Sequence, residues 1–172
     1  MPRPEAVIVA GLGPEGELRA VDLVHTVRQA VIEWSQRESE KRSGGAAAFE
    51  LASTLIGSGG SGVSAAQSAQ LIAQGVREAN ERLAKIRWPV VAHLHLIELY
   101  LERATEAWRS LQVQASSSPA QYVVTGSIQS SRGAMKRPLE SGYRGADYDL
   151  ISAISDQDAA CLLYTSPSPR DS

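Results

Sequence analysis

The residues with the clearest chemical potential form a glycine-rich loop, Gly57-x-Gly59-x-x-Gly62, which is expected to join a strand to a helix. Glycines at such a turn let the backbone approach a ligand closely, and the free N–H groups that begin the next helix favour an anion. A dinucleotide site also needs an acidic residue about 20 positions further on, at a strand end. Glu78 and Glu81 lie near that offset, but inside the predicted helix. The loop therefore predicts a looser phosphate cradle, with a turn that binds nothing as the alternative.

A second glycine turn, Gly11-Leu12-Gly13-Pro14, also follows a predicted strand. The carboxyl ends of parallel strands meet at one edge of a sheet, so both glycine turns are expected there, where they would frame a cleft. If the protein binds a small molecule, the pattern favours a nucleotide phosphate at residues 57 to 64. Besides residues of the loop itself, the candidate phosphate-binding residues are Gly11 and Gly13 in this second turn and Ser64 at the start of the predicted helix after the loop.

Other chemistry-bearing residues give weaker predictions. His93 and His95 are two apart on a predicted strand, so they share a face and could bind a metal ion. No third ligand is apparent, and two partly buried strand residues are the simpler interpretation. The nucleophile pattern Gly-x-Ser-x-Gly fails around Ser61 because Val63 occupies its last position, which argues against a serine hydrolase. No cofactor or metal ion is predicted.

Alternating strands and helices must position these loops. The apolar run Ala6 to Ala10 lacks alternation and predicts a strand buried on both faces. Further strands are expected over Phe49 to Ile56 and Val90 to Ile97. This order predicts an α/β fold in which helices cover a parallel sheet, followed by an incomplete, mostly β segment.

Three amphipathic helices are expected between and after these strands. They cover about Arg19 to Ser39, the segment that follows Ser64, and about Glu98 to Gln112. Ser64 and Gln67 fit a capping box at the start of the second helix. The predicted buried stripes are Val21, Val24, Val27, Val31 and Trp34, then Leu71, Ile72, Val76, Ala79 and Leu83, then Leu101, Ala104, Trp108 and Leu111.

Composition divides the chain into parts. Residues 1–113 form the predicted α/β module, and residues 114–121 form a Ser-rich linker. Residues 122–160 are expected to begin a further module, with a strand over Tyr122 to Ile128. Residues 161–172 are interpreted as an artefact, because Cys161 to Asp171 back-translate without a mismatch into the transposase adapter of short-read sequencing libraries. The native reading frame is then expected to leave the printed sequence near Asp158 to Ala160.

Charge and hydropathy exclude several classes of protein. The formal net charge of −2 lacks the basic footprint of a nucleic-acid binder. Outside the tail the chain has no cysteine, which excludes disulfides and thiolate chemistry from the native part. No segment has the length of a membrane span and no signal peptide is apparent, so a cytoplasmic protein is expected.

Residues 6–112 resemble the C-terminal half of a macro-type domain, the fold shared with the N-terminal domain of leucine aminopeptidases. The resemblance is carried by residues 7–13, by residues 55–62 and by the strand at residues 90–97 with its following helix. It implies that the glycine loop holds the diphosphate of ADP-ribose. The asparagine-bearing half that completes such a pocket is absent from the printed sequence. The contacts implied by the resemblance are Gly57, Ser58, Gly59, Ser61 and Gly62.

The whole native stretch resembles the region upstream of the protease domain in bacterial CHAT proteins, which are caspase-like cysteine proteases of signalling and defence. The most distinctive part is Gly142-Tyr143-Arg144-Gly145-Ala146-Asp147-Tyr148-Asp149. The resemblance implies a non-catalytic accessory module that senses a ligand or regulates the downstream domains of the same parent chain. Two alternatives stay open: half of a macro-type enzyme that binds or hydrolyses ADP-ribose derivatives, and a structural interaction domain without a ligand.

Overall fold

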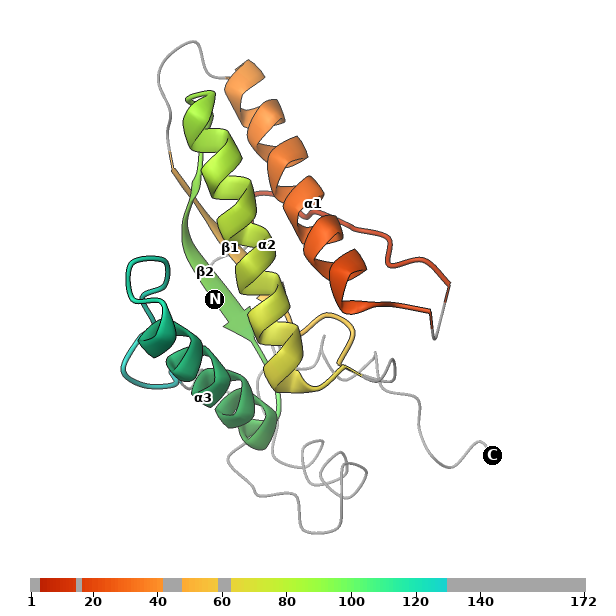
Figure 1. Cartoon of the computed structure of the whole chain (residues 1–172). Coiled ribbons are helices and arrows are strands. Elements are labelled where there is room, and N and C mark those ends of the chain that lie inside the picture. The colour runs from red at the N-terminus through yellow and green to blue at the C-terminus, as the bar shows by residue number, and fades with distance from the viewer. Residues whose placement is uncertain (1–3, 15–16, 42–47, 59–62, 130–172) are drawn as a thin grey trace.

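The computed structural model describes residues 4–14, 17–41, 48–58 and 63–129. Its elements in chain order are α1 (Ala20–Lys41), β1 (Phe49–Thr54), α2 (Ala65–Lys85), β2 (Val91–Ile97) and α3 (Leu101–Ser117), as labelled in Figure 1. These elements confirm the predicted α/β class for the described residues. They also confirm the helix and strand order from α1 to α3.

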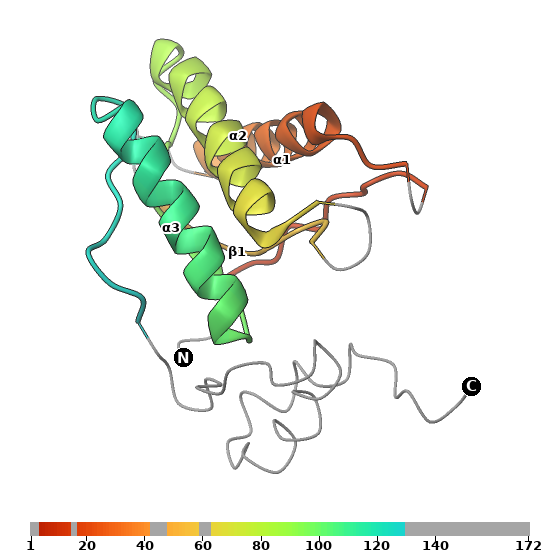
Figure 2. The same ribbon diagram turned by 60° about the horizontal axis from the view of Figure 1, so that its bottom comes forward.

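The strands β1 and β2 form a two-stranded parallel sheet, with α2 as the crossover between them. Figures 1 and 2 show α2 lying between α1 and α3, with the helices gathered over one face of the sheet. Leu51 pairs with Leu94, and both pack against the hydrophobic core beneath the helices. The described fold therefore has one helical layer and one strand layer.

A register shift near the start of the sheet decides which residues of β2 enter the core. Phe49 pairs with Val91, but the next residue of β1, Glu50, pairs with His93, so Ala92 is an extra residue on β2. Strict alternation from the buried Val91 would turn His93 inward. The extra residue reverses that alternation and turns Leu94 inward instead.

The main core lies between α1, α2 and the sheet. Its buried members are Leu23, Val27, Val31, Ile72, Val76, Ala79, Leu83 and Val91. Most of the predicted stripes on α1 and α2 are thus confirmed. Two corrections apply to α1: Val21 is 64% exposed, and the buried residue in the fourth turn is Ser35 rather than its neighbour Trp34. Ser35 is tolerated in the core because its hydroxyl donates a 2.6 Å hydrogen bond to the Pro89 carbonyl.

The capping interaction at the start of α2 is confirmed. The Ser64 hydroxyl accepts a 3.1 Å hydrogen bond from the Gln67 N–H, which satisfies one of the free donors of the first turn. At the other end of the helix, the Asn80 side chain both donates to and accepts from the backbone of Val91, at 2.8 and 2.9 Å. This pair of hydrogen bonds connects α2 to the first residue of β2.

The prediction of a buried strand over Ala6 to Ala10 is wrong. The structure assigns no strand to residues 4–14, and the side chains of Val7 and Val9 are 75% and 91% exposed. A strand buried on both faces needs cover from two layers, whereas the described helices cover only one face of the sheet. Leu12 does pack against the core, so this segment is anchored by its end.

The strand predicted over Tyr122 to Ile128 is also wrong, and so is the predicted end of the third helix. The helix α3 continues beyond Gln112 to Ser117, and the segment after it follows the helices instead of joining the sheet. Both Trp108 and Gln112 donate 3.0 Å hydrogen bonds to the Thr125 carbonyl, which removes that group from any strand ladder. The rest of the predicted β segment, residues 130–160, lies outside the described residues.

The buried stripe predicted for α3 is confirmed in part, since Leu111 packs against the smaller core cluster. Ala107 is the buried residue of this helix, while Leu101 is exposed and Trp108 is half-buried. The reason is close packing against α2, where Ala107 joins Ala65 and Ala69 in a small apolar cluster. Small side chains on both helices let their backbones approach, and Leu101 is left outside this contact.

Candidate functional site

The described part of the glycine loop is a tight turn after β1. Gly57 has a φ of +79°, which L side chains rarely adopt, so glycine is required there. The next residue, Ser58, donates a 2.6 Å hydrogen bond from its hydroxyl to the Leu55 carbonyl. The predicted contacts Gly59, Ser61 and Gly62 lie outside the described residues.

An arginine from α3 binds this turn. The Arg103 guanidinium donates to both the carbonyl and the hydroxyl of Ser58, with a distance of 3.1 Å for the carbonyl, and its Nε donates to Glu98 at 3.0 Å. Glu98 in turn accepts the N–H groups of Leu99 and Tyr100. We call Ser58, Glu98 and Arg103 the clamp, because they connect the loop after β1 with the loop after β2.

The sequence interpretation missed Arg103 as a site residue. Its side chain is only 23% exposed, although Arg is seldom buried without a partner. The available signal was its place in the first turn of a helix that follows a parallel strand. Such a position lies at the same carboxyl edge as the glycine loop, but the pairing with Ser58 spans 45 residues and has no local pattern.

The start of α2 already has an internal anion beside it. The Glu106 carboxylate, from α3, accepts a 3.2 Å hydrogen bond from the Ala66 N–H. Together with the Ser64 cap, this bond uses two of the donors that an external phosphate would seek. A ligand at this helix end would therefore compete with Glu106.

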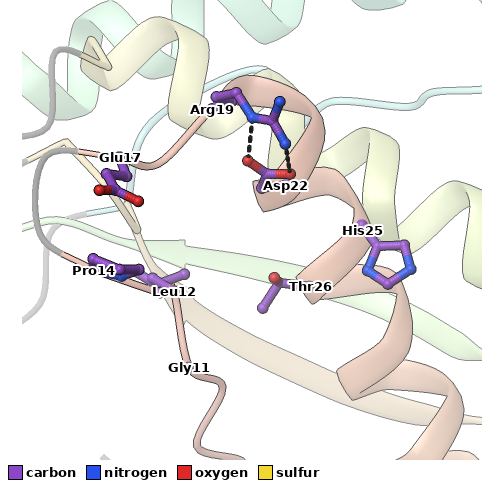
Figure 3. Close-up of a pocket in the computed structure, with 9 residues that line it drawn as sticks. Gly11, Leu12, Pro14, Glu17, Arg19, Asp22, His25 and Thr26 are labelled. Carbon is purple, nitrogen blue, oxygen red and sulfur yellow. Dashed lines mark hydrogen bonds and ion pairs between the residues drawn. The ribbon is translucent and has the colours of Figure 1, made fainter.

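The other glycine turn lines a separate, open pocket of about 530 Å³. One side of it is the segment from Gly11 to Pro14 and the other is the first turns of α1, as Figure 3 shows. Gly13 has a φ of +81°, so a glycine is required at that position too. None of Gly57, Ser58 and Ser64 lines this pocket, so the expected common cleft is not formed by the described residues.

An exposed ion pair lies at the rim of that pocket. Arg19 donates two hydrogen bonds to Asp22, at 2.8 and 3.0 Å. The hydrogen bond from Arg19 is the main reason that the pKa of the Asp22 carboxyl is lowered. Because each charge already satisfies the other, this pair offers little to a charged ligand.

The two strand histidines lie away from both glycine turns, on the face of the sheet that the described helices leave open. Their side chains are 70% exposed for His93 and 56% for His95, so the interpretation as partly buried residues is wrong. The physical reason is the extra residue Ala92, which turns both rings outward. Glu50 on β1 lies between them, with its two carboxylate oxygens 3.6 Å from His93 Nδ1 and 3.4 Å from His95 Nε2.

Within the described residues no group of three or more histidine, cysteine, aspartate or glutamate side chains could hold a metal ion. Among the described helices, none is both long and apolar enough to cross a membrane. Comparison with protein-family models, with curated proteins and with solved structures finds no match for this chain.

Proposed function

We propose that this chain is a non-catalytic accessory module of a CHAT-type bacterial protein, and that it binds a nucleotide phosphate at the turn formed by Gly57 and Ser58. The observation that carries the binding proposal is the position of Arg103 beside this turn. A guanidinium has five N–H donors, and three of them make the bonds of the clamp. Among the described residues no acceptor is bonded to the other two, which would bind the ligand. The glycine turn would supply close backbone approach, and the arginine would supply N–H donors.

The clamp also suggests how binding would be transmitted. A phosphate that draws Arg103 toward itself acts on Glu98, and Glu98 accepts both N–H groups at the start of the loop before α3. Binding at the loop after β1 would thus change the hydrogen bonds of Glu98 at the start of α3, the last described helix. This coupling suits a module that regulates the domains that follow it in a parent chain.

Calorimetry with ADP-ribose and with pyrophosphate tests the binding proposal. We expect the full chain to bind. Gly59→Glu should abolish binding, because it adds a negative charge that repels the phosphate. Arg103→Lys, which keeps the charge but loses the forked geometry, should weaken binding about tenfold. The matched control is Arg109→Gln, an exposed arginine of the same helix, which should bind as the wild type does.

A structural interaction domain without a ligand is the second candidate, and the bond from Ala66 to Glu106 favours it. The variant Glu106→Gln separates the two functions. If the loop binds phosphate, removing the competing carboxylate should tighten binding. If neither the wild type nor Glu106→Gln binds either probe, the ligand-free function stands. Turnover of an ADP-ribose derivative would instead support the macro-type hydrolase.

The association with CHAT proteins depends on the resemblance of the native stretch, whose most distinctive part, residues 142–149, lies outside the described residues. Sequencing of the source DNA across the codons for Asp156 to Cys161, from a library free of the transposase adapter, tests it. A reading frame that continues into a caspase-like domain with its histidine and cysteine supports the proposal. A frame that encodes Cys161 to Ser172 and then stops contradicts it.

A further inference from the structure

The segment that follows α3 turns back along the helices. The N–H groups of Gln121 and Tyr122 both donate to the Ser118 carbonyl, at 2.9 and 3.2 Å, which reverses the direction of the chain. Figure 2 shows the chain then running back beside α3. We call residues 118–129 the strap. No residue of the strap is part of a helix or strand, so its position depends on its contacts with side chains of the helices.

Side chains from two helices bind the strap at two points. From α2, Arg77 Nε donates to the Tyr122 hydroxyl at 3.1 Å, across 45 residues of sequence. From α3, Trp108 Nε1 and Gln112 Nε2 both donate to the Thr125 carbonyl, each at 3.0 Å. Residues four apart lie on the same side of a helix, so these two donors reach one acceptor. The strap is therefore attached to both helices by three hydrogen bonds of side chains.

The strap buries little apolar surface against the helices. The side chain of Val123 is 97% exposed and that of Ile128 is 37% exposed. Neither residue belongs to the two apolar clusters of the described core. One hydrogen bond of this kind changes an equilibrium by about two- to tenfold. The strap should therefore open far more readily than the core, because opening the core must expose buried apolar side chains.

We propose that the strap is a releasable device, which opens by breaking its bonds to Arg77, Trp108 and Gln112 while α1, α2 and α3 stay folded. In the closed state these bonds fix residue 129 relative to α2 and α3, and opening releases it. The strap thus switches the attachment of the following segments to the helical layer between a fixed and a free state. This proposal is independent of phosphate binding, because the clamp is made by other side chains, those of Ser58, Glu98 and Arg103.

Hydrogen exchange of the Trp108 indole N–H, followed by NMR on the full chain, tests the proposal. In the wild type this N–H should exchange more slowly than that of a free indole, but faster than the core amides of α2. Tyr122→Phe removes the acceptor of Arg77 and should speed the exchange by about two- to tenfold. The matched control is Val123→Ala at the adjacent position, which should leave the rate unchanged because that side chain is exposed.

A double variant tests whether Arg77 and Tyr122 act through their shared bond. Arg77→Met keeps most of the length of the side chain but removes the donor, and should speed the exchange as Tyr122→Phe does. Because both substitutions remove the same bond, the double variant should exchange no faster than the faster single variant. Effects of the two substitutions that multiply would overturn the proposed attachment.

The wild type alone can also overturn the proposal. A Trp108 indole N–H that exchanges like a free indole would show that the strap is not attached. A rate equal to that of the core amides of α2, with the same dependence on denaturant, would show that the strap opens only when the whole protein unfolds. Circular dichroism should show that each variant keeps its helices.

Discussion

At the scale of single residues, one ion pair between α1 and α2 stands apart from the exposed pairs. Arg28 donates to Glu78 at 2.7 Å, and the side chains are only 17% and 24% exposed. The pKa of the Glu78 carboxyl is lowered, first by its hydrogen bond from Gln74 and next by that from Arg28. The folded state therefore favours the ionised form of the Glu78 carboxyl.

This ion pair makes the stability of the protein depend on pH. A carboxyl whose pKa is lower in the folded than in the unfolded chain stabilises fully above its unfolded pKa, which is about 4.3 for glutamate. That contribution is lost as the pH falls through the lower, folded pKa. We predict that Glu78→Gln reduces the free energy of unfolding at pH 7 by about 1–2 kcal/mol and flattens its decline below about pH 5. Urea unfolding across pH measures both effects.

The control for this prediction is Glu81→Gln, on the same helix, because the Glu81 side chain is 56% exposed in its pair with Arg77. An exposed pair contributes about 0–1 kcal/mol, so this variant should lie close to the wild type. Identical pH profiles for Glu78→Gln and Glu81→Gln would contradict the assignment of the acid-sensitive term to Glu78.

At the scale of elements, the contact between α1 and α2 depends on a buried glycine. A Cβ atom added at Gly75 would lie 2.9 Å from the Val24 carbonyl oxygen and 2.9 Å from the Val27 Cβ. Neither atom is the far end of a flexible side chain, so α1 would have to move away. Gly75 thus sets the distance between the two helices, at the cost of a weaker intrinsic helix propensity for α2.

We predict that Gly75→Ala destabilises the protein by about 1–3 kcal/mol, although alanine in an exposed helix position would stabilise it by about 1 kcal/mol. Chemical denaturation measures the change. The control is Gly11→Ala, since nothing lies within 4 Å of a Cβ added there and its φ is not positive. A stabilised Gly75→Ala variant would show that the helices are further apart than the structure places them.

At the scale of the whole molecule, the described sheet is short and has two open edges. Only β1 and β2 pair in the described part, so each strand has one edge without a neighbouring strand. An open edge presents unpaired N–H and C=O groups to other chains. The face that carries Glu50, Ala52 and His95 is also open to solvent.

We predict that the printed chain is marginally stable and associates as its concentration rises, through pairing of these edges. Ala52→Lys places a charge on the exposed face of β1 and should reduce association in light scattering. Val113→Lys is the control, because it removes an exposed apolar side chain from α3 without touching the sheet. A sharp, reversible melting transition of a monomer, independent of concentration, would contradict the prediction.

The sequence by itself determined the features that a few neighbouring residues encode. The spacing of apolar residues predicted α1 and α2, and the Ser64 cap was confirmed at the position where Ser64 and Gln67 predicted it. The strand from Val91 was also predicted almost to the residue. Hydrophobic period and cap chemistry act over one or two turns, so their physical basis is present in any short window of sequence.

Only the tertiary structure decided the contacts between elements that lie apart in the sequence. Ala92 is an extra residue only relative to the register of β1, and this register turns His93 toward solvent. The bond between Arg103 and Ser58 joins residues 45 apart in sequence, and the exposure of Val9 follows from which face the helices cover. Strand register, contacts between distant side chains and the choice of which sheet face the helices bury each depend on two elements at once. A periodic pattern within one element contains no information about its neighbour.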